Sequence, residues 1–241
     1  MTSSMAIKSV AAMTLFMTQG AFGEEPPRKR VQAESTSLTQ FGPNGTIRFT
    51  NSSGYLIVEG WDRQDVEVTV LKWIDHEFLA EQVAAATKRL QDISVSVEHP
   101  SAQELKISTA REKGKLRKGK GRVELKYHIY APRDSRIAVD HHGGFILLSG
   151  LTGDIDVANR RGDIVLMLPA PASYAIDARN TFGIVTPDFT GTTKHKYVIG
   201  EQFARNGQAA AHRMRLRMGF GGITIKEVPP EGEPPAATSM K

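Results

Sequence analysis

Residues 143–168 read GGFILLSGLTGDIDVANRRGDIVLML, and this stretch decides the fold class. Gly144, Gly153 and Gly162 stand nine residues apart, and each precedes a short aliphatic run. Glycine can adopt the positive φ of a corner between strands, and aliphatic residues at alternate positions then point into one core. One such unit cannot bury its own face, whereas stacked units can. The pattern predicts a mainly β protein, a β-solenoid or β-roll of short strands, with an antiparallel β-sandwich as the alternative.

The same phrase, glycine followed by an aliphatic run, returns at Gly183 and Gly222. Nearer the amino terminus, polar and apolar residues alternate with the period of two that is typical of β-strands. These segments are 46–50, 55–59, 65–70, 93–98, 104–108 and 123–130. The strand pattern therefore extends from the first third of the chain to residue 227.

Residues 77–90 (EFLAEQVAAATKRL) change to helical spacing and contain neither glycine nor proline. Phe78, Val83 and Leu90 fall on one stripe, which predicts an amphipathic helix. Asp75 is the expected N-cap, and the basic pair Lys88-Arg89 suits the carboxyl end of the helix dipole.

The predicted organisation has four parts. Residues 1–23 are expected to be a signal peptide, because a short apolar run is followed by small residues at Ala21 and Gly23. Residues 24–40 are polar and are predicted to be a flexible lead-in, 41–227 the β-repeat domain, and 228–241 a disordered proline-rich tail. The mature chain is then exported, to the periplasm or beyond the cell, and has no transmembrane helix.

Cysteine is absent, which excludes disulfides, thiolate metal sites and cysteine nucleophiles. The net charge of +5 is concentrated in residues 111–126, which carry eight Lys or Arg and two Glu. The rest of the chain is nearly neutral. This is the balance of a neutral body with one basic segment, not of a uniformly basic nucleic-acid coat.

The basic segment around residues 111–122 is predicted to be a glycine-bearing hairpin loop. Its charge suits an anionic polymer or a lipid headgroup, and the alternative is a solvated loop without a partner. It contains no aromatic residue for base stacking, which argues against specific single-strand recognition. The candidate binding residues are Lys113, Lys115, Arg117, Lys118, Lys120 and Arg122.

Two clusters are candidate metal sites. His141 and His142 are good ligand types, but adjacent residues of a strand point to opposite faces, so solvated histidines in a turn are favoured. Asp154, Asp156 and Asp163 resemble a sparse acidic ladder, but the dense Gly-Gly-x-Gly-x-Asp phrase of calcium-binding rolls is missing. We therefore expect no metal and no cofactor, and we expect the aspartates to bond turn backbone.

The enzymatic alternative is a carbohydrate-active β-helix that acts on acidic polysaccharide with acids among Asp154, Asp156 and Asp163. Glycoside cleavage needs two carboxyl groups across a cleft, and sugar clefts usually display aromatic surfaces. Trp61 and Trp73 both lie outside the repeats. No Gly-x-Ser-x-Gly or His-Glu-x-x-His phrase occurs.

The chain resembles the bacterial putative-adhesin family of β-strand-repeat proteins, a domain of unknown function. The resemblance rests on Gly60-Trp61-Asp62-Arg63, the Gly-Asp-Ile repeats, Leu168-Pro169 and residues 173–178 (SYAIDA), and it covers residues 46–226. It implies a right-handed β-solenoid or β-roll in an exported or envelope-associated protein without catalytic residues. The chain departs from the family pattern in 111–126 and 187–218. The sequence thus predicts an exported, non-enzymatic scaffold or binding module with an envelope or surface partner.

Overall fold

The computed structural model describes residues 27–111, 119–170, 173–196, 199–206 and 212–229. The helix of these ranges is α1 (Ala80–Gln91). The strands are β1 (Lys29–Gln40), β2 (Thr46–Trp61), β3 (Asp65–Phe78), β4 (Ile93–Ser101), β5 (Glu104–Arg111), β6 (Val123–Pro132), β7 (Arg136–Ser149), β8 (Ile155–Pro169), β9 (Tyr174–Phe182), β10 (Val185–Pro187), β11 (Thr192–Lys196), β12 (Gly200–Arg205) and β13 (His212–Val228).

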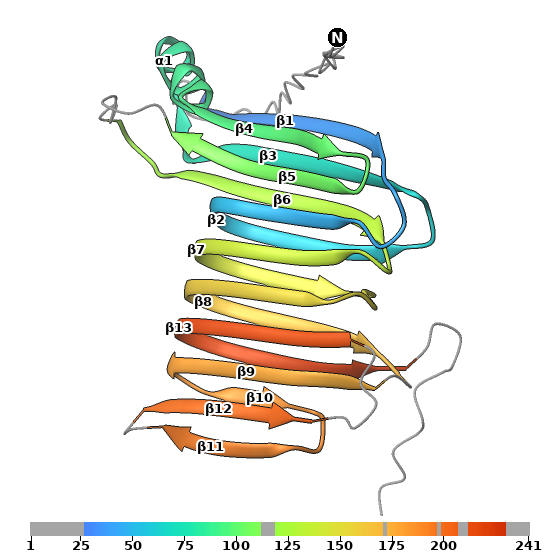
Figure 1. The fold of residues 1–241 in the computed structure, drawn as a ribbon. Helices are drawn as coiled ribbons and strands as arrows, with labels where there is room; N and C mark the ends of the chain where they lie inside the picture. Colours follow the sequence, from blue (N-terminus) through green and yellow to red (C-terminus); the bar gives the residue numbers. More distant parts are fainter. Residues whose placement is uncertain (1–26, 112–118, 171–172, 197–198, 207–211, 230–241) are drawn as a thin grey trace, which may run out of the picture.

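Within these ranges the strands join one mixed sheet. Its main path runs β1-β3-β6-β2-β7-β8-β13-β9-β12-β11, so β1 and β11 lie at opposite ends of the stack (Figure 1). The pairs from β2 through β7, β8 and β13 to β9 are parallel, whereas β1–β3, β3–β6, β9–β12 and β11–β12 are antiparallel. The prediction of a mainly β protein is confirmed.

The parallel strands bend at a row of glycines. Gly54, Gly144, Gly162 and Gly221 occupy equivalent positions in β2, β7, β8 and β13, and all have positive φ. A Cβ on Gly144 would lie 1.9 Å from the carbonyl oxygen of Gly54. No side chain fits there, and this explains why the repeat needs glycine.

The repeat differs from the prediction in two of its glycines. Gly153 lies in the turn between β7 and β8, where its amide donates to Arg133 O, and Gly222 follows the bend glycine Gly221. The distance between equivalent residues of β7 and β8 is therefore eighteen, as in the pair Ile137–Ile155, and not nine. One repeat unit therefore consists of the strand segment before the bend, the bend itself, the strand segment after it, and the turn to the next strand; we call the two strand segments its limbs.

Each bent strand buries alternate residues on both limbs. In β8 these are Ile155 and Val157 before the bend and Ile164 and Leu166 after it. All belong to one core cluster, and full burial of such a side chain contributes about 1.5–3 kcal/mol. Figure 1 shows the resulting front and back layers.

The strand order is not that of a regular solenoid, in which coils follow one another along the chain. The last strand, β13, lies between β8 and β9 and pairs in parallel with both (Figure 1). The parallel central pairs are a feature of the solenoid prediction, and the two facing layers are a feature of the sandwich alternative.

The flexible lead-in predicted for 24–40 is wrong for residues 29–40, which form β1 and pair with β3 along its length. The alternation in this segment is mostly polar because β1 is an edge strand, and Val31 is its buried residue. Val31 joins Ile74, Phe78 and Leu90 in a small core under α1.

The predicted helix is present but begins at Ala80, after the N-cap Leu79, and not at residue 77. Asp75 is not the N-cap, because β3 continues through Phe78 and the Asp75 amide donates to Arg122 O. The first turn of a helix leaves backbone N–H groups without intrahelical partners, whereas strand pairing gives these residues backbone hydrogen bonds, and this favours the longer strand.

The predicted signal peptide, most of the proline-rich tail and the loop residues Lys113, Lys115, Arg117 and Lys118 lie outside the described residues. Within the described residues no helix has the length and hydropathy needed to span a membrane.

Candidate functional site: an arginine-lined depression

A polar residue stands three positions before several bend glycines and bonds to the bend of a neighbouring strand. His141 Nε2 donates to Gly54 O at 3.2 Å, Asn159 Nδ2 to Gly144 O at 3.1 Å, and Asn180 Nδ2 to Gly221 O at 2.6 Å. These side chains are buried, so each bond satisfies a carbonyl that the bend turns away from the ladder. This row of buried polar side chains, which we call the inner polar row, therefore links the bends of neighbouring strands by hydrogen bonds on the inner face of the sheet.

The prediction of solvated histidines is wrong for His141, whose side chain is fully buried, and right for the exposed His142. Burial lowers the pKa of His141. Hydrogen bonds with the Gly54 and Gly143 backbone and the charge of Asp140 act in the opposite direction, but their effect on this pKa is smaller. Within the described residues no group of three or more His, Asp or Glu could hold a metal ion.

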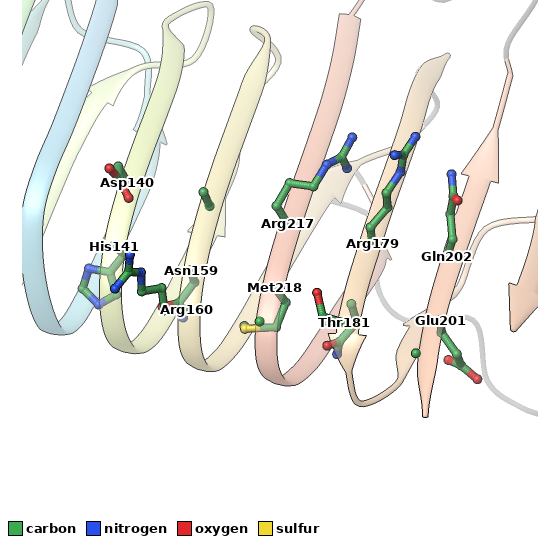
Figure 2. A pocket seen from close by; sticks show the side chains of 14 residues that line it. Asp140, His141, Asn159, Arg160, Arg179, Thr181, Glu201, Gln202, Arg217 and Met218 are labelled. Atoms are coloured by element: carbon green, nitrogen blue, oxygen red, sulfur yellow. The ribbon is translucent and has the colours of Figure 1, made fainter. Parts of the chain in front are cut away.

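On the outer face beside the bends lies a depression of about 500 Å³. One row across its floor reads Asp140, Ala158, Arg217, Arg179 and Gln202, from β7, β8, β13, β9 and β12. Figure 2 shows Arg217, Arg179 and Gln202 on three adjacent strands. The surface is hollow here because residues with small or absent side chains stand among the larger side chains of this row and its neighbours.

Gly219 and Gly200 are two of these small residues, and Arg160, on the strand beside Gly219, lines the depression too. A Cβ on Gly219 would lie 2.4 Å from the backbone oxygen of Arg160. Glycine therefore lets β13 lie close to β8 and leaves room above them.

Asp177, beside the depression, holds two of the guanidinium groups in place. Its carboxylate accepts bonds from Arg179 at 3.1 and 3.2 Å and from Arg217 Nη2 at 2.6 Å. Arg217 Nη1 also donates to the backbone oxygen of Asp177 at 2.8 Å. Burial raises the pKa of Asp177, but the bonds and charges of the two arginines outweigh it, so the pKa lies below its ordinary value.

The acidic side chains that line the depression are Asp140 and Glu201. Glu201 is engaged elsewhere, since Oε2 accepts from the Val185 amide at 2.7 Å and Oε1 lies 3.3 Å from His195 Nδ1. The lining therefore carries three arginines against two carboxylates, Asp177 beside it pairs with Arg179 and Arg217, and the exposed Arg160 forms no ion pair with any described residue. Such a site favours an anionic ligand.

The predicted acidic cluster does not assemble into a site. Asp154 Oδ1 accepts from the Arg213 amide and Asp163 Oδ1 from the Gly222 amide, both at 2.9 Å, so two of the three fasten β13 to β8. Asp156 faces Arg215 at 3.6 Å. Asp163 lies beyond the bend that separates it from the other two. Asp154 and Asp163 do bond backbone, but the amides belong to β13 and not to the turns in which the sequence predicts these bonds.

The two described cations of the basic loop lie far along the stack from the depression. The carbonyl oxygens of Lys120 and Gly121 accept from Arg89 of α1 at 2.6 and 2.7 Å, and Arg122 pairs with Glu124 at 2.6 Å. These residues lead into β6, from which β2, β7 and β8 separate β13. The structure thus has two cationic regions.

The sequence interpretation missed Arg160, Arg179 and Arg217. Arg179 and Arg217 each occupy an outward position between two buried residues of a strand, so the alternation itself marks them as outward-facing. Arg160 instead follows the buried Asn159 and precedes the exposed Arg161 at the bend. Their gathering was not visible, because it requires β13 to lie between β8 and β9.

No family model matches this chain, and no curated protein matches it. Solved structures do resemble it. One is a putative cell adhesion protein from Clostridium sporogenes, with 12% identity and a TM-score of 0.47, covering 81% of this chain and 100% of that one. Another is a putative adhesin from Bacteroides fragilis, with 14% identity and a TM-score of 0.23, covering 86% and 100%. A third is a putative adhesin from Parabacteroides distasonis, with 10% identity and a TM-score of 0.22, covering 81% and 97%.

These names agree with the family that the sequence resembles.

Proposed function

We propose that this chain is an exported, non-enzymatic binding module of the cell envelope or surface, adhesin-like and built as an irregular β-solenoid, which holds an anionic partner in the arginine-lined depression. The observation that carries the proposal is the set of three guanidinium groups, Arg160, Arg179 and Arg217, on adjacent strands of one outer face.

Pre-organisation supports anion binding at this place. Asp177 and backbone oxygens fix Arg217 and Arg179, so less side-chain entropy is lost when a ligand accepts their remaining hydrogen bonds. Arg160 adds an exposed charge at the rim. A carboxylate or phosphate can accept two parallel bonds from a guanidinium, which gives direction as well as charge.

The enzymatic alternative has no comparable support. Two of its three candidate acids, Asp154 and Asp163, accept hydrogen bonds from backbone amides of β13. A general acid must instead be free to exchange a proton with substrate.

The test measures binding to polygalacturonate, with dextran as the uncharged comparison. The double variant Arg160→Gln/Arg179→Gln is expected to bind polygalacturonate about tenfold more weakly, since a hydrogen bond to a charged group contributes about 1.5–3 kcal/mol. The control Arg30→Gln/Arg48→Gln removes the same charge from exposed ion pairs on β1 and β2. It should bind as the wild type does.

A second arm replaces the six loop cations by glutamine: Lys113, Lys115, Arg117, Lys118, Lys120 and Arg122. Loss of binding in the loop variant, together with wild-type binding in Arg160→Gln/Arg179→Gln, would refute the depression as the site and assign it to the loop. Export is tested separately, by amino-terminal sequencing of the protein from envelope and medium fractions, where a start at Glu24 is expected.

A further inference from the structure

Exposed apolar side chains gather at one stretch of the bend edge. Of the seven large apolar residues that are strongly exposed in the described part of the chain, four lie here. They are Phe182 (43% exposed), Phe220 (51%), Ile184 (63%) and Ile199 (61%). The rings of Phe182 and Phe220 are 4.5 Å apart and nearly parallel, at 8°. We call these four residues the apolar edge.

The backbone explains why they are together. Phe220 directly precedes the bend glycine Gly221, and Phe182 precedes Gly183, which also has a positive φ and follows the end of β9. The two phenylalanines lie opposite one another in the β9–β13 pair. The Gly183 amide donates to Ile199 O, and the Ile223 amide donates to Ile184 O. The inward positions beside the bend belong to Asn180 and other buried residues, so these rings point outward.

Cations continue the same row on the neighbouring strand. Arg161 is opposite Phe220 in β8, and its Cζ lies 5.9 Å from the ring centroid. Arg160, one residue earlier, is part of the depression. The apolar edge and the arginine-lined depression are therefore adjoining parts of one surface.

The acids nearest the apolar edge are held by backbone amides and not by Arg160 or Arg161. Asp163 and Glu201 each accept a hydrogen bond from a backbone amide, of Gly222 and Val185. Asp140, on β7, is in register with Ala158 of β8, two residues before Arg160, and lies three strands away from the phenylalanine of β9. A surface with protruding aromatic and aliphatic groups beside arginines complements an anionic membrane, where rings enter the headgroup boundary and arginines contact phosphate.

We infer that the apolar edge, together with Arg160 and Arg161, docks this protein onto an anionic lipid bilayer. The inference rests on the proposed function and names its partner. A second copy of the chain fits less well, because a two-fold interface on this patch would place Arg160 and Arg161 near their own copies. Like charges in such an interface cost free energy.

The experiment measures sedimentation with vesicles of phosphatidylcholine alone and of phosphatidylcholine mixed with phosphatidylglycerol. Wild type should bind the anionic vesicles more tightly, and Arg160→Gln/Arg161→Gln should weaken that binding roughly 25-fold, from about fivefold per basic residue. Phe182→Ala/Phe220→Ala should weaken it at least about tenfold, because two half-exposed rings no longer insert. The control Leu38→Ala/Tyr55→Ala removes equally exposed apolar groups elsewhere and should bind like the wild type.

Two readouts separate this inference from the proposed function. The Phe182→Ala/Phe220→Ala variant should keep wild-type affinity for polygalacturonate, because the arginines remain. Equal vesicle binding by this variant and the wild type, or no binding of wild type to anionic vesicles, would overturn the membrane inference even if polygalacturonate still binds. A wild-type dimer that the phenylalanine variant converts to monomer, without vesicle binding, would also overturn it and assign the edge to self-association.

Discussion

The replacement Gly144→Ala should be strongly destabilising, whereas Gly143→Ala next to it should not. Gly144 has φ of 128°, and a Cβ there would meet the Gly54 carbonyl oxygen at 1.9 Å. Backbone strain at such a φ costs about 1–3 kcal/mol. The new methyl group also requires β2 and β7 to separate by more than an ångström, which breaks ladder bonds and the His141–Gly54 bond at about 1 kcal/mol each. The expected loss is about 3–5 kcal/mol, a large part of a typical unfolding free energy.

Gly143 is the matched control. It lacks a positive φ, and its Cβ would have its nearest contact at 3.6 Å, from the backbone oxygen of Arg161. Alanine there should raise stability by about 0.4–1 kcal/mol, because it restricts the unfolded chain. Urea unfolding followed by far-ultraviolet circular dichroism measures both variants. If the midpoint of Gly144→Ala equals that of Gly143→Ala at the same m-value, the close packing of the bend glycines does not determine stability.

Three further outcomes are expected. Burial lowers the pKa of His141, so the unfolded state takes up a proton at higher pH than the folded state does, and the stability of the wild type should fall as the pH drops below about 6.5. The variant His141→Asn should flatten this pH dependence in urea unfolding measured from pH 5 to 8. An unchanged slope would count against a buried neutral imidazole. In Arg217→Gln the pKa of Asp177 should rise towards its ordinary value in a carboxyl NMR titration, and no rise would show that Arg179 alone holds it down. Glutamine at all cations of 113–122 should leave the melting temperature within about 2 °C of wild type, because the sequence predicts a solvated loop here and solvated charges contribute little to stability. A larger drop would make this segment part of the fold.

Local patterns predicted the local features. The period of two located most strands, and the change to helical spacing located α1 to within three residues at its start. The bend glycines 144, 162 and 183 were recognised as corners. These features depend on residues close in the sequence, so a linear pattern contains them.

Edge and long-range features were missed for physical reasons. β1 has few buried residues, so its polar alternation resembles a flexible segment. The inner polar row did have a signal, a polar residue three positions before glycine at His141, Asn159 and Asn180, which was not recognised. The arginine-lined depression had none, because its rows combine strands whose order in the sheet differs from their order in the chain.

The position of β13 sets the order in which this molecule can be completed. Met214 pairs with both Ile155 and Ile176, so the strand joins two parts of the sheet that the chain has already passed. A nascent chain that has emerged only to residue 211 has β8 and β9 without their common neighbour, and each presents an open edge. The central sheet can therefore close only when residues 212–228 are available, after nearly all of the other described residues. The appearance of β13, and not that of the repeats, is the step that completes the central sheet.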